Sequence, residues 1–232
     1  MNDENLRTLT FSYNQRFKMK IISTNISKIK TVEHNGKKVK TGIFKTPTNE
    51  PVVIEKLNII GDEQADLVNH GGVDKAIYAF SHNHYDYWKR TLKNDDLAVG
   101  AFGENFTISD LDEQNIHIGD RIRIGTALLE VSQPRVPCFK LAIALNNKQS
   151  LKLFTQYYHT GVYFRVLEQG VAKTGDAVTF EHKAEHNISV KTLFQAFFDK
   201  QYPDYENVLL AALELPELAL EWQTKIKKKL GS

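Results

Sequence analysis

The sequence predicts a mainly β fold that carries helices, a barrel or a sandwich, followed by a small domain of three helices. Segments rich in Val and Ile and broken by Gly and Pro recur from Met19 onward and are typical of strands. After about His186 the apolar residues instead take the i, i+3, i+4 spacing of amphipathic helices. We therefore expect an N-terminal extension over 1–18, a mainly β domain over 19–186 and a helical domain over 187–230.

The expected elements follow in chain order. Strand-like segments cover residues 19–30, 37–45, 51–60, 76–81, 161–170 and 176–184, and residues 121–133 resemble a hairpin that turns at Gly125. Tyr85, Trp88 and Leu92 share one side of a predicted helix over 82–92. Two short helices are predicted over 139–145 and 150–158.

In the helical domain, Ser189 can cap the first helix. Pro203 ends this first helix, and residues 204–213 form a second one. Pro216 opens a third helix, whose terminal Lys run suits the negative end of a helix dipole. A unit of about 45 residues is marginal on its own, so we expect it to pack against the rest of the chain.

Composition excludes several function classes. The net charge of +2 gives no bulk attraction to nucleic acid or membranes, and no segment is apolar enough to span a bilayer. The first residues lack the apolar core of a signal peptide, and the single cysteine fits a reducing compartment, so we expect a cytoplasmic protein. One cysteine also argues against an iron–sulfur cluster and a structural zinc site, and no dinucleotide-binding or P-loop motif is present.

Cys138 is the first candidate for chemistry. Pro134 and Pro137 stiffen the backbone before it, and a predicted helix starts immediately after it. Because it lies at a helix start between Arg135 and Lys140, its thiol is expected to have a lowered pKa and to serve as a nucleophile or metal ligand. The alternative is a small buried apolar residue.

A second candidate precedes the strand at 76–81. It contains two adjacent glycines, which permit close backbone approach to a ligand, together with donors for an anion such as phosphate. The segment comprises Asp66, His70, Gly71, Gly72 and Lys75. The alternative is a glycine turn with solvated charges.

Three further features carry weaker signals. The loop at 100–107, which includes Glu104, is typical of a structural turn. Arg165 lies within a strand and needs an anionic partner, which could be an Asp or Glu of the same chain. His82 and His84 form an H-x-H pair, but no third metal ligand is evident, so surface or capping roles are expected.

Several motifs together closely resemble the MOSC domain, named for the C-terminal domain of molybdenum cofactor sulfurase. They are "ADLVNHGGVDKAIYAFS", "GAFGENFT", "IHIGDRIRIGTALLEVSQPRVPCFKLA" and "GVYFRVLEQGVAKTGD", in this order. The segment "ALELPELALEW" resembles the three-helix extension of the 6-N-hydroxylaminopurine resistance branch. Each motif is weak by itself, whereas the ordered set is specific.

The resemblance implies a MOSC-type β-barrel in which Cys138 binds the metal of a molybdenum cofactor and takes part in reducing N-hydroxylated bases to amines. The implied cofactor-binding residues are Cys138, His70, Gly71, Gly72, Lys75, Arg135 and Arg165. The proton donor is expected among Asp66, His70 and Glu104, and the expected catalytic residues are Cys138, Asp66 and His70. A flavoprotein reductase or similar donor must supply electrons.

Three alternatives remain open at this stage. Cys138 could carry a persulfide as a sulfur carrier. It could act as the nucleophile of a hydrolase, with His70 as base and Asp66 as its orienting group. The protein could also bind or hand over the molybdenum cofactor without catalysis.

Overall fold

The computed structural model describes residues 19–231, so the predicted extension over 1–18 lies outside the described residues. The strands are β1 (Lys20–Ile26), β2 (Lys30–His34), β3 (Lys37–Thr41), β4 (Thr46–Thr48), β5 (Val52–Ile54), β6 (Ile77–Ser81), β7 (Phe106–Ser109), β8 (Arg121–Ile124), β9 (Ala127–Pro134), β10 (Val162–Glu168), β11 (Gly170–Ala172) and β12 (Val178–His182). The α-helices are α2 (Leu67–His70), α3 (Tyr85–Leu92), α4 (Phe139–Ala144), α5 (Ser150–Tyr157), α6 (Val190–Phe198), α7 (Tyr205–Leu213) and α8 (Leu220–Leu230). Short 3-10 turns, η1 (Val73–Lys75) and η2 (His82–His84), flank β6.

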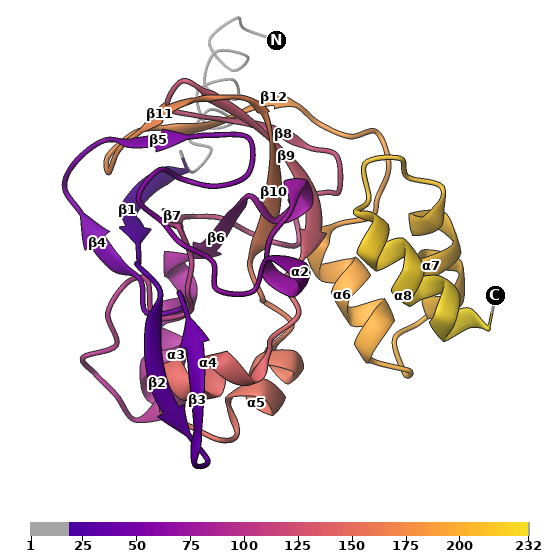
Figure 1. Cartoon of the computed structure of the whole chain (residues 1–232). Coiled ribbons are helices and arrows are strands. Elements are labelled where there is room, and N and C mark those ends of the chain that lie inside the picture. The colour runs from indigo at the N-terminus through magenta and orange to yellow at the C-terminus, as the bar shows by residue number, and fades with distance from the viewer. Residues whose placement is uncertain (1–18, 232) are drawn as a thin grey trace, which may run out of the picture.

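A curled sheet of eight strands forms the body of the protein (Figure 1), in the order β12-β8-β9-β10-β6-β7-β1-β4. The β6–β7 pair is parallel, and the other pairs in this sheet are antiparallel. Main-chain hydrogen bonds of 2.9–3.0 Å join Met19 and Ile21 to the segment 175–178, next to β12. The expected mainly β fold is confirmed. An isolated bridge between Lys20 and Ala177, and not a continuous ladder, joins β1 to the segment before β12, so the eight strands do not form a closed barrel.

Two turns explain how the strands are connected. The predicted hairpin turns at Gly125, whose φ is +56° and where a Cβ atom would lie 2.1 Å from the Val171 carbonyl oxygen. Asn35 and Gly36, with φ of 52° and 71°, form the turn of the β2–β3 hairpin, as expected for Asn-Gly. Of the predicted strand at 51–60, only Val52–Ile54 forms β5.

The three predicted C-terminal helices are present and pack beside the sheet (Figure 1). The Ser189 side chain accepts a hydrogen bond of 3.1 Å from Thr192 N, as predicted for a cap. The third helix starts at Leu220 rather than at Pro216. The buried Trp222 ring of α8 donates a 3.2 Å hydrogen bond to the Pro134 carbonyl, which places α8 against the end of β9.

The apolar residues of α6–α8 belong to the same buried cluster as the inward-facing residues of the sheet. A second cluster of mostly aromatic side chains, which includes Phe80, Trp88, Phe102 and Phe154, packs α3 and α5 against the other side of β6. The division at 186/187 remains a prediction. Within residues 19–231, no helix is both long enough and apolar enough to cross a membrane.

Candidate functional site

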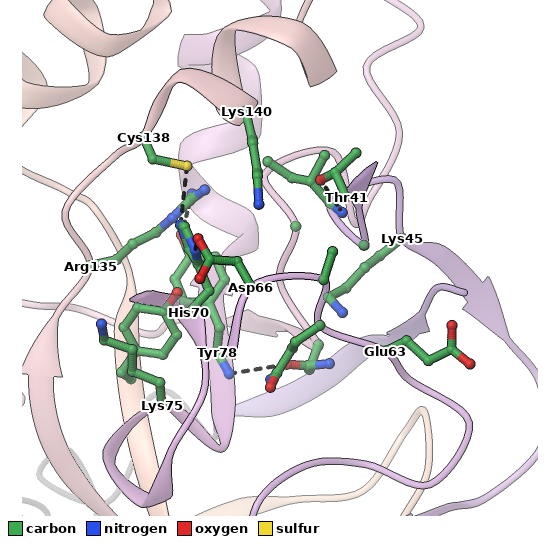
Figure 2. Close-up of a pocket in the computed structure, with 17 residues that line it drawn as sticks. Thr41, Lys45, Glu63, Asp66, His70, Lys75, Tyr78, Arg135, Cys138 and Lys140 are labelled. Atoms are coloured by element: carbon green, nitrogen blue, oxygen red, sulfur yellow. Dashed lines mark hydrogen bonds and ion pairs between the residues drawn. The ribbon is translucent and has the colours of Figure 1, made fainter. Parts of the chain in front are cut away.

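A pocket of about 590 Å³, including the solvent at its mouth, opens beside Cys138 (Figure 2). Its walls come from segments far apart in the sequence: the β3–β4 connection, the loop before α2, the strands β6 and β10, and the turn into α4. The lining residues are Thr41, Gly42, Ile43, Lys45, Glu63, Gln64, Ala65, Asp66, His70, Lys75, Tyr78, Gly103, Asn105, Arg135, Cys138, Lys140 and Tyr163.

Cys138 lies at the turn between β9 and α4, in the N-cap position of that helix. Its backbone is extended, and the side chain is half-buried with the sulfur directed toward His70 (Figure 2). Burial alone would raise the pKa of the thiol. The hydrogen bond from His70, the positive charge of Arg135 and the backbone N–H of Lys140 outweigh it, and the pKa falls to about 7. About half of the thiol is therefore ionised at neutral pH, as the sequence predicted qualitatively.

His70 connects the thiol to a carboxylate. Its Nε2 lies 3.3 Å from Cys138 Sγ, and its Nδ1 lies 3.4 Å from an Asp66 carboxylate oxygen. Asp66 and His70 are four residues apart, at the start and end of the α2 turn, so one short helix aligns both side chains. The structure therefore places the three predicted catalytic residues next to one another, in the order Cys138, His70, Asp66.

Arg135 is a buried cation without a carboxylate partner among residues 19–231. Its guanidinium lies over the Tyr78 ring at 4.7 Å and the Phe154 ring at 5.2 Å, and it donates to Tyr78 Oη at 3.1 Å. Aromatic faces stabilise the cation without neutralising it. Because a buried charge normally needs a counter-charge, this arrangement suits an anionic ligand in the pocket.

Two lysines on the pocket wall have acidic partners. Lys75 forms an ion pair with Glu221, so α8 places a carboxylate against one of the cations of the pocket. Lys45 is buried against Asp62, which also accepts hydrogen bonds from Ser27 N and Asn105 Nδ2. Burial lowers the pKa of Lys45 although Asp62 counteracts this effect. Lys140 also lines the pocket and reaches toward its centre (Figure 2).

Three predicted cofactor-binding residues do not line the pocket. Gly72 has a φ of +94°, which explains why glycine is needed in this turn, and Gly71 packs closely against the Leu67 backbone. Arg165 pairs with Asp74 at 2.7 Å and with Glu130 at 3.0 Å, so its anionic partners are carboxylates of the chain itself.

Glu104, considered as a proton donor, is fully buried and does not line the pocket. It accepts hydrogen bonds from Tyr85 Oη, Thr107 Oγ1 and two backbone amides. Burial raises its pKa despite these bonds. Glu104 therefore holds the turn at 100–107 together, which is the structural role expected for that loop.

Sequence reasoning missed several residues of the wall, namely Lys45, Tyr78, Asn105 and Tyr163. Tyr78 and Tyr163 were placed on strands, but their pairing in adjacent strands, with rings 5.1 Å apart, depends on the sheet order. Lys45 is the last residue of the predicted strand over 37–45 and carries no local signal for a place in the pocket wall.

The fold and the pocket define a class of protein, a curled mainly β domain that presents one ionisable thiol in a cation-lined pocket. The chain matches the MOSC domain over residues 66–179. It is also 40% identical to the uncharacterized protein YflK of Bacillus subtilis over 211 residues, which cover 90% of this chain and 93% of YflK. The chain belongs to the MOSC domain family, and the resemblance expected from its motifs is confirmed.

Two further relatives bear on the fold and on function. The crystal structure of YiiM from Geobacillus stearothermophilus superposes with a TM-score of 0.77 at 32% identity, covering 91% of this chain and 99% of YiiM. A Gibberella moniliformis protein named "Reductase" is 33% identical over 147 residues, which cover 62% of this chain and 26% of that protein. The YiiM match includes the C-terminal helices, because it spans almost the whole chain.

Proposed function

We propose that the protein is an oxidoreductase that binds a molybdenum cofactor at Cys138 and reduces small N-hydroxylated compounds, such as hydroxylaminopurine-like bases, to amines. The observation that carries this proposal is the pairing of a thiol of pKa about 7 with a buried cation, Arg135, in one pocket. Membership of the MOSC family and the similarity to a protein named "Reductase" support it.

The residues of the pocket fit the cofactor. Its dithiolene provides two sulfur ligands, so the protein needs to add one soft donor, and the Cys138 thiolate is such a donor. Its phosphate needs cations, which the pocket supplies as Arg135, Lys140 and Lys75. When bound, the cofactor would supply the two-electron chemistry that reduces an N–O bond.

His70 would hold a proton at Nε2, beside the sulfur. Reduction of an N-hydroxyl group to an amine consumes two protons along with two electrons and releases water, so a proton donor at the metal ligand is useful. Asp66, 3.4 Å from Nδ1, would orient the imidazole. Lys75, by contrast, is partly neutralised by Glu221, so we assign the main share of anion binding to Arg135.

The electron donor would be a separate flavoprotein reductase or a similar protein, because no nucleotide-binding motif appears in this sequence. We place the reaction in the cytoplasm, where the single thiol stays reduced. Nucleic acid polymers and membranes are not expected as partners, given the net charge of +2.

Metal analysis tests the proposal. Protein would be purified from a host that makes the molybdenum cofactor, as wild type, Cys138→Ser, Lys140→Met and the matched surface variant Lys152→Met. We expect molybdenum in wild type and Lys152→Met, less in Lys140→Met and none in Cys138→Ser. Loaded wild type, given electrons, should convert an N-hydroxylated purine to its amine. Equal molybdenum in wild type and Cys138→Ser would refute the proposal.

A second candidate is sulfur transfer through a persulfide on Cys138. The line of Cys138, His70 and Asp66 favours it, because the same arrangement activates thiol nucleophiles in the absence of metal. A desulfurase would then supply the sulfur. Mass spectrometry of metal-free protein after incubation with a persulfide donor distinguishes the two functions. A gain of one sulfur atom at Cys138, in protein that never retains molybdenum, would support the second.

A further inference from the structure

A second polar cluster lies apart from the Cys138 pocket and consists of His84, Glu113 and His159. His84 Nε2 lies 3.1 Å and His159 Nδ1 lies 3.0 Å from the same oxygen, Glu113 Oε2. All three potential ligand atoms lie within 4.8 Å of one another. None of these residues is among those that line the pocket.

The cluster joins three segments that are distant in sequence. His84 ends η2, Glu113 lies between β7 and β8, and His159 lies between α5 and β10. Glu113 is completely buried, whereas the two imidazoles are 13% and 18% exposed. An ion could therefore reach the carboxylate from the side of the imidazoles.

The Glu113 carboxylate is buried and fixed in place. Its Oε1 accepts a 3.0 Å hydrogen bond from Gly161 N, which leaves Oε2 directed at both imidazoles. A buried carboxylate with this fixed orientation is a suitable ligand for a cation.

The second nitrogen of His84 also has a partner. Tyr157 Oη lies 2.9 Å from His84 Nδ1, and the Tyr157 ring stacks on Tyr87 with centroids 3.8 Å apart. This stacking joins α3 and α5 (Figure 1) and fixes the hydroxyl. If Nδ1–H donates to Tyr157 Oη, the lone pair of Nε2 faces Glu113. Metal-binding histidines are commonly oriented by such a hydrogen bond on the other nitrogen.

We propose that His84, Glu113 and His159 bind a divalent transition metal ion, with zinc as the best match. Two imidazole nitrogens and one carboxylate oxygen are a common zinc ligand set, with water in the fourth position. Zinc–ligand distances of about 2.0–2.2 Å at tetrahedral angles place neighbouring ligand atoms about 3.3 Å apart. The observed 3.1 Å and 3.0 Å separations are close to this value.

The bound ion would hold the loop before β10. Thr160, next to His159, accepts a 2.8 Å hydrogen bond from the Tyr78 hydroxyl through its carbonyl. Tyr78 in turn contacts Arg135 in the Cys138 pocket. Metal binding would thus stabilise one wall of that pocket without contributing a ligand to it. A surface or capping role was expected for His84, but its side chain makes no capping hydrogen bond and contacts the buried Glu113.

Zinc binding to the full-length protein tests the proposal. Metal-free protein carrying Cys138→Ser, so that the thiol cannot bind metal, would be titrated with Zn²⁺ by calorimetry. We expect one ion per chain and a higher melting temperature with zinc. His84→Gln and His159→Gln, each added to this background, should abolish both effects. His82→Gln, in the same turn as His84 but exposed, is the matched control and should bind zinc normally.

Cobalt provides an independent readout. Co²⁺ in the Cys138→Ser protein should give visible absorption bands of a four- or five-coordinate nitrogen–oxygen site, and His159→Gln should remove them. Tyr157→Phe should weaken zinc binding by about 10–100-fold, because it removes the partner of His84 Nδ1. The proposal is overturned if the parent protein binds no zinc, or if folded His84→Gln and His159→Gln proteins bind it as tightly as the parent.

Discussion

The ionisation of Cys138 depends on its contact with His70, and the substitution His70→Gln tests this dependence. The 3.3 Å contact between Nε2 and the sulfur is the largest of the influences that lower the thiol pKa to about 7. Glutamine retains a polar side chain but cannot carry the positive charge of an imidazolium. Burial, which raises the pKa, would then be opposed chiefly by Arg135 and the Lys140 backbone N–H.

The size of the expected pKa shift follows from the pKa of Cys138 in the folded protein and that of a free cysteine. A thiol of pKa about 7 is half ionised at pH 7. A free cysteine, with a pKa of about 8.5, is ionised to about 3% at the same pH. His70→Gln should move the pKa most of this distance, to about 8 or above. The thiolate fraction at pH 7 should fall by roughly tenfold.

The assay is alkylation of metal-free protein by iodoacetamide over a range of pH. The midpoint of the pH–rate profile is the decisive quantity, because a thiolate of higher pKa is also intrinsically more nucleophilic and partly offsets the loss in rate at a single pH. The exposed variant His82→Gln should keep the wild-type midpoint. An unchanged midpoint in folded His70→Gln would refute the role given to this imidazole.

Three other outcomes are expected. Because the folded pKa of Cys138, about 7, lies below the value of about 8.5 for a free cysteine, its ionisation should stabilise the fold by about 2 kcal/mol above about pH 8.5. This increment should disappear as pH falls through about 7, and urea unfolding of wild type and Cys138→Ser across this range would show it as a pH-dependent difference. Glu221→Gln removes a negative charge beside Lys75 and should tighten inorganic phosphate binding by about fivefold in calorimetry, whereas equal or weaker binding would contradict the assigned ion pair. Trp222→Ala should cost about 3–5 kcal/mol in urea unfolding, since the ring is fully buried, while Leu220→Ala, 71% exposed, should cost little.

Local patterns were sufficient for much of the fold. The turn at Gly125 and the cap at Ser189 depend on residues that are adjacent in sequence, and both predictions are confirmed. The start of the last helix was misplaced at Pro216, because proline fits the first turn of a helix but does not require one. The hydrogen bond between Ile21 and Asp176, which joins β1 to the segment before β12, has no local signal in the sequence.

In the candidate site, too, features that depend on neighbouring residues were predicted, whereas contacts between distant residues were not. The lowered pKa of Cys138 was predicted from its neighbours Arg135 and Lys140, and both lie at the pocket. The contact with His70 spans 68 residues, so only the resemblance to a known family placed the two together. The cluster of His84, Glu113 and His159 spans 75 residues (159 − 84) and could not be recognised from ligand spacing.

Arg165 shows that a sequence pattern can predict an anionic partner without identifying which anion it is. A half-buried arginine in a strand requires an anion, and phosphate and carboxylate satisfy it equally well. The chain itself provides the anions, because Asp74 and Glu130 both contact this guanidinium. Arg165 also donates a 2.8 Å hydrogen bond to the Glu217 carbonyl, just before α8. It therefore anchors the segment that leads into α8, the helix that carries Glu221 to Lys75.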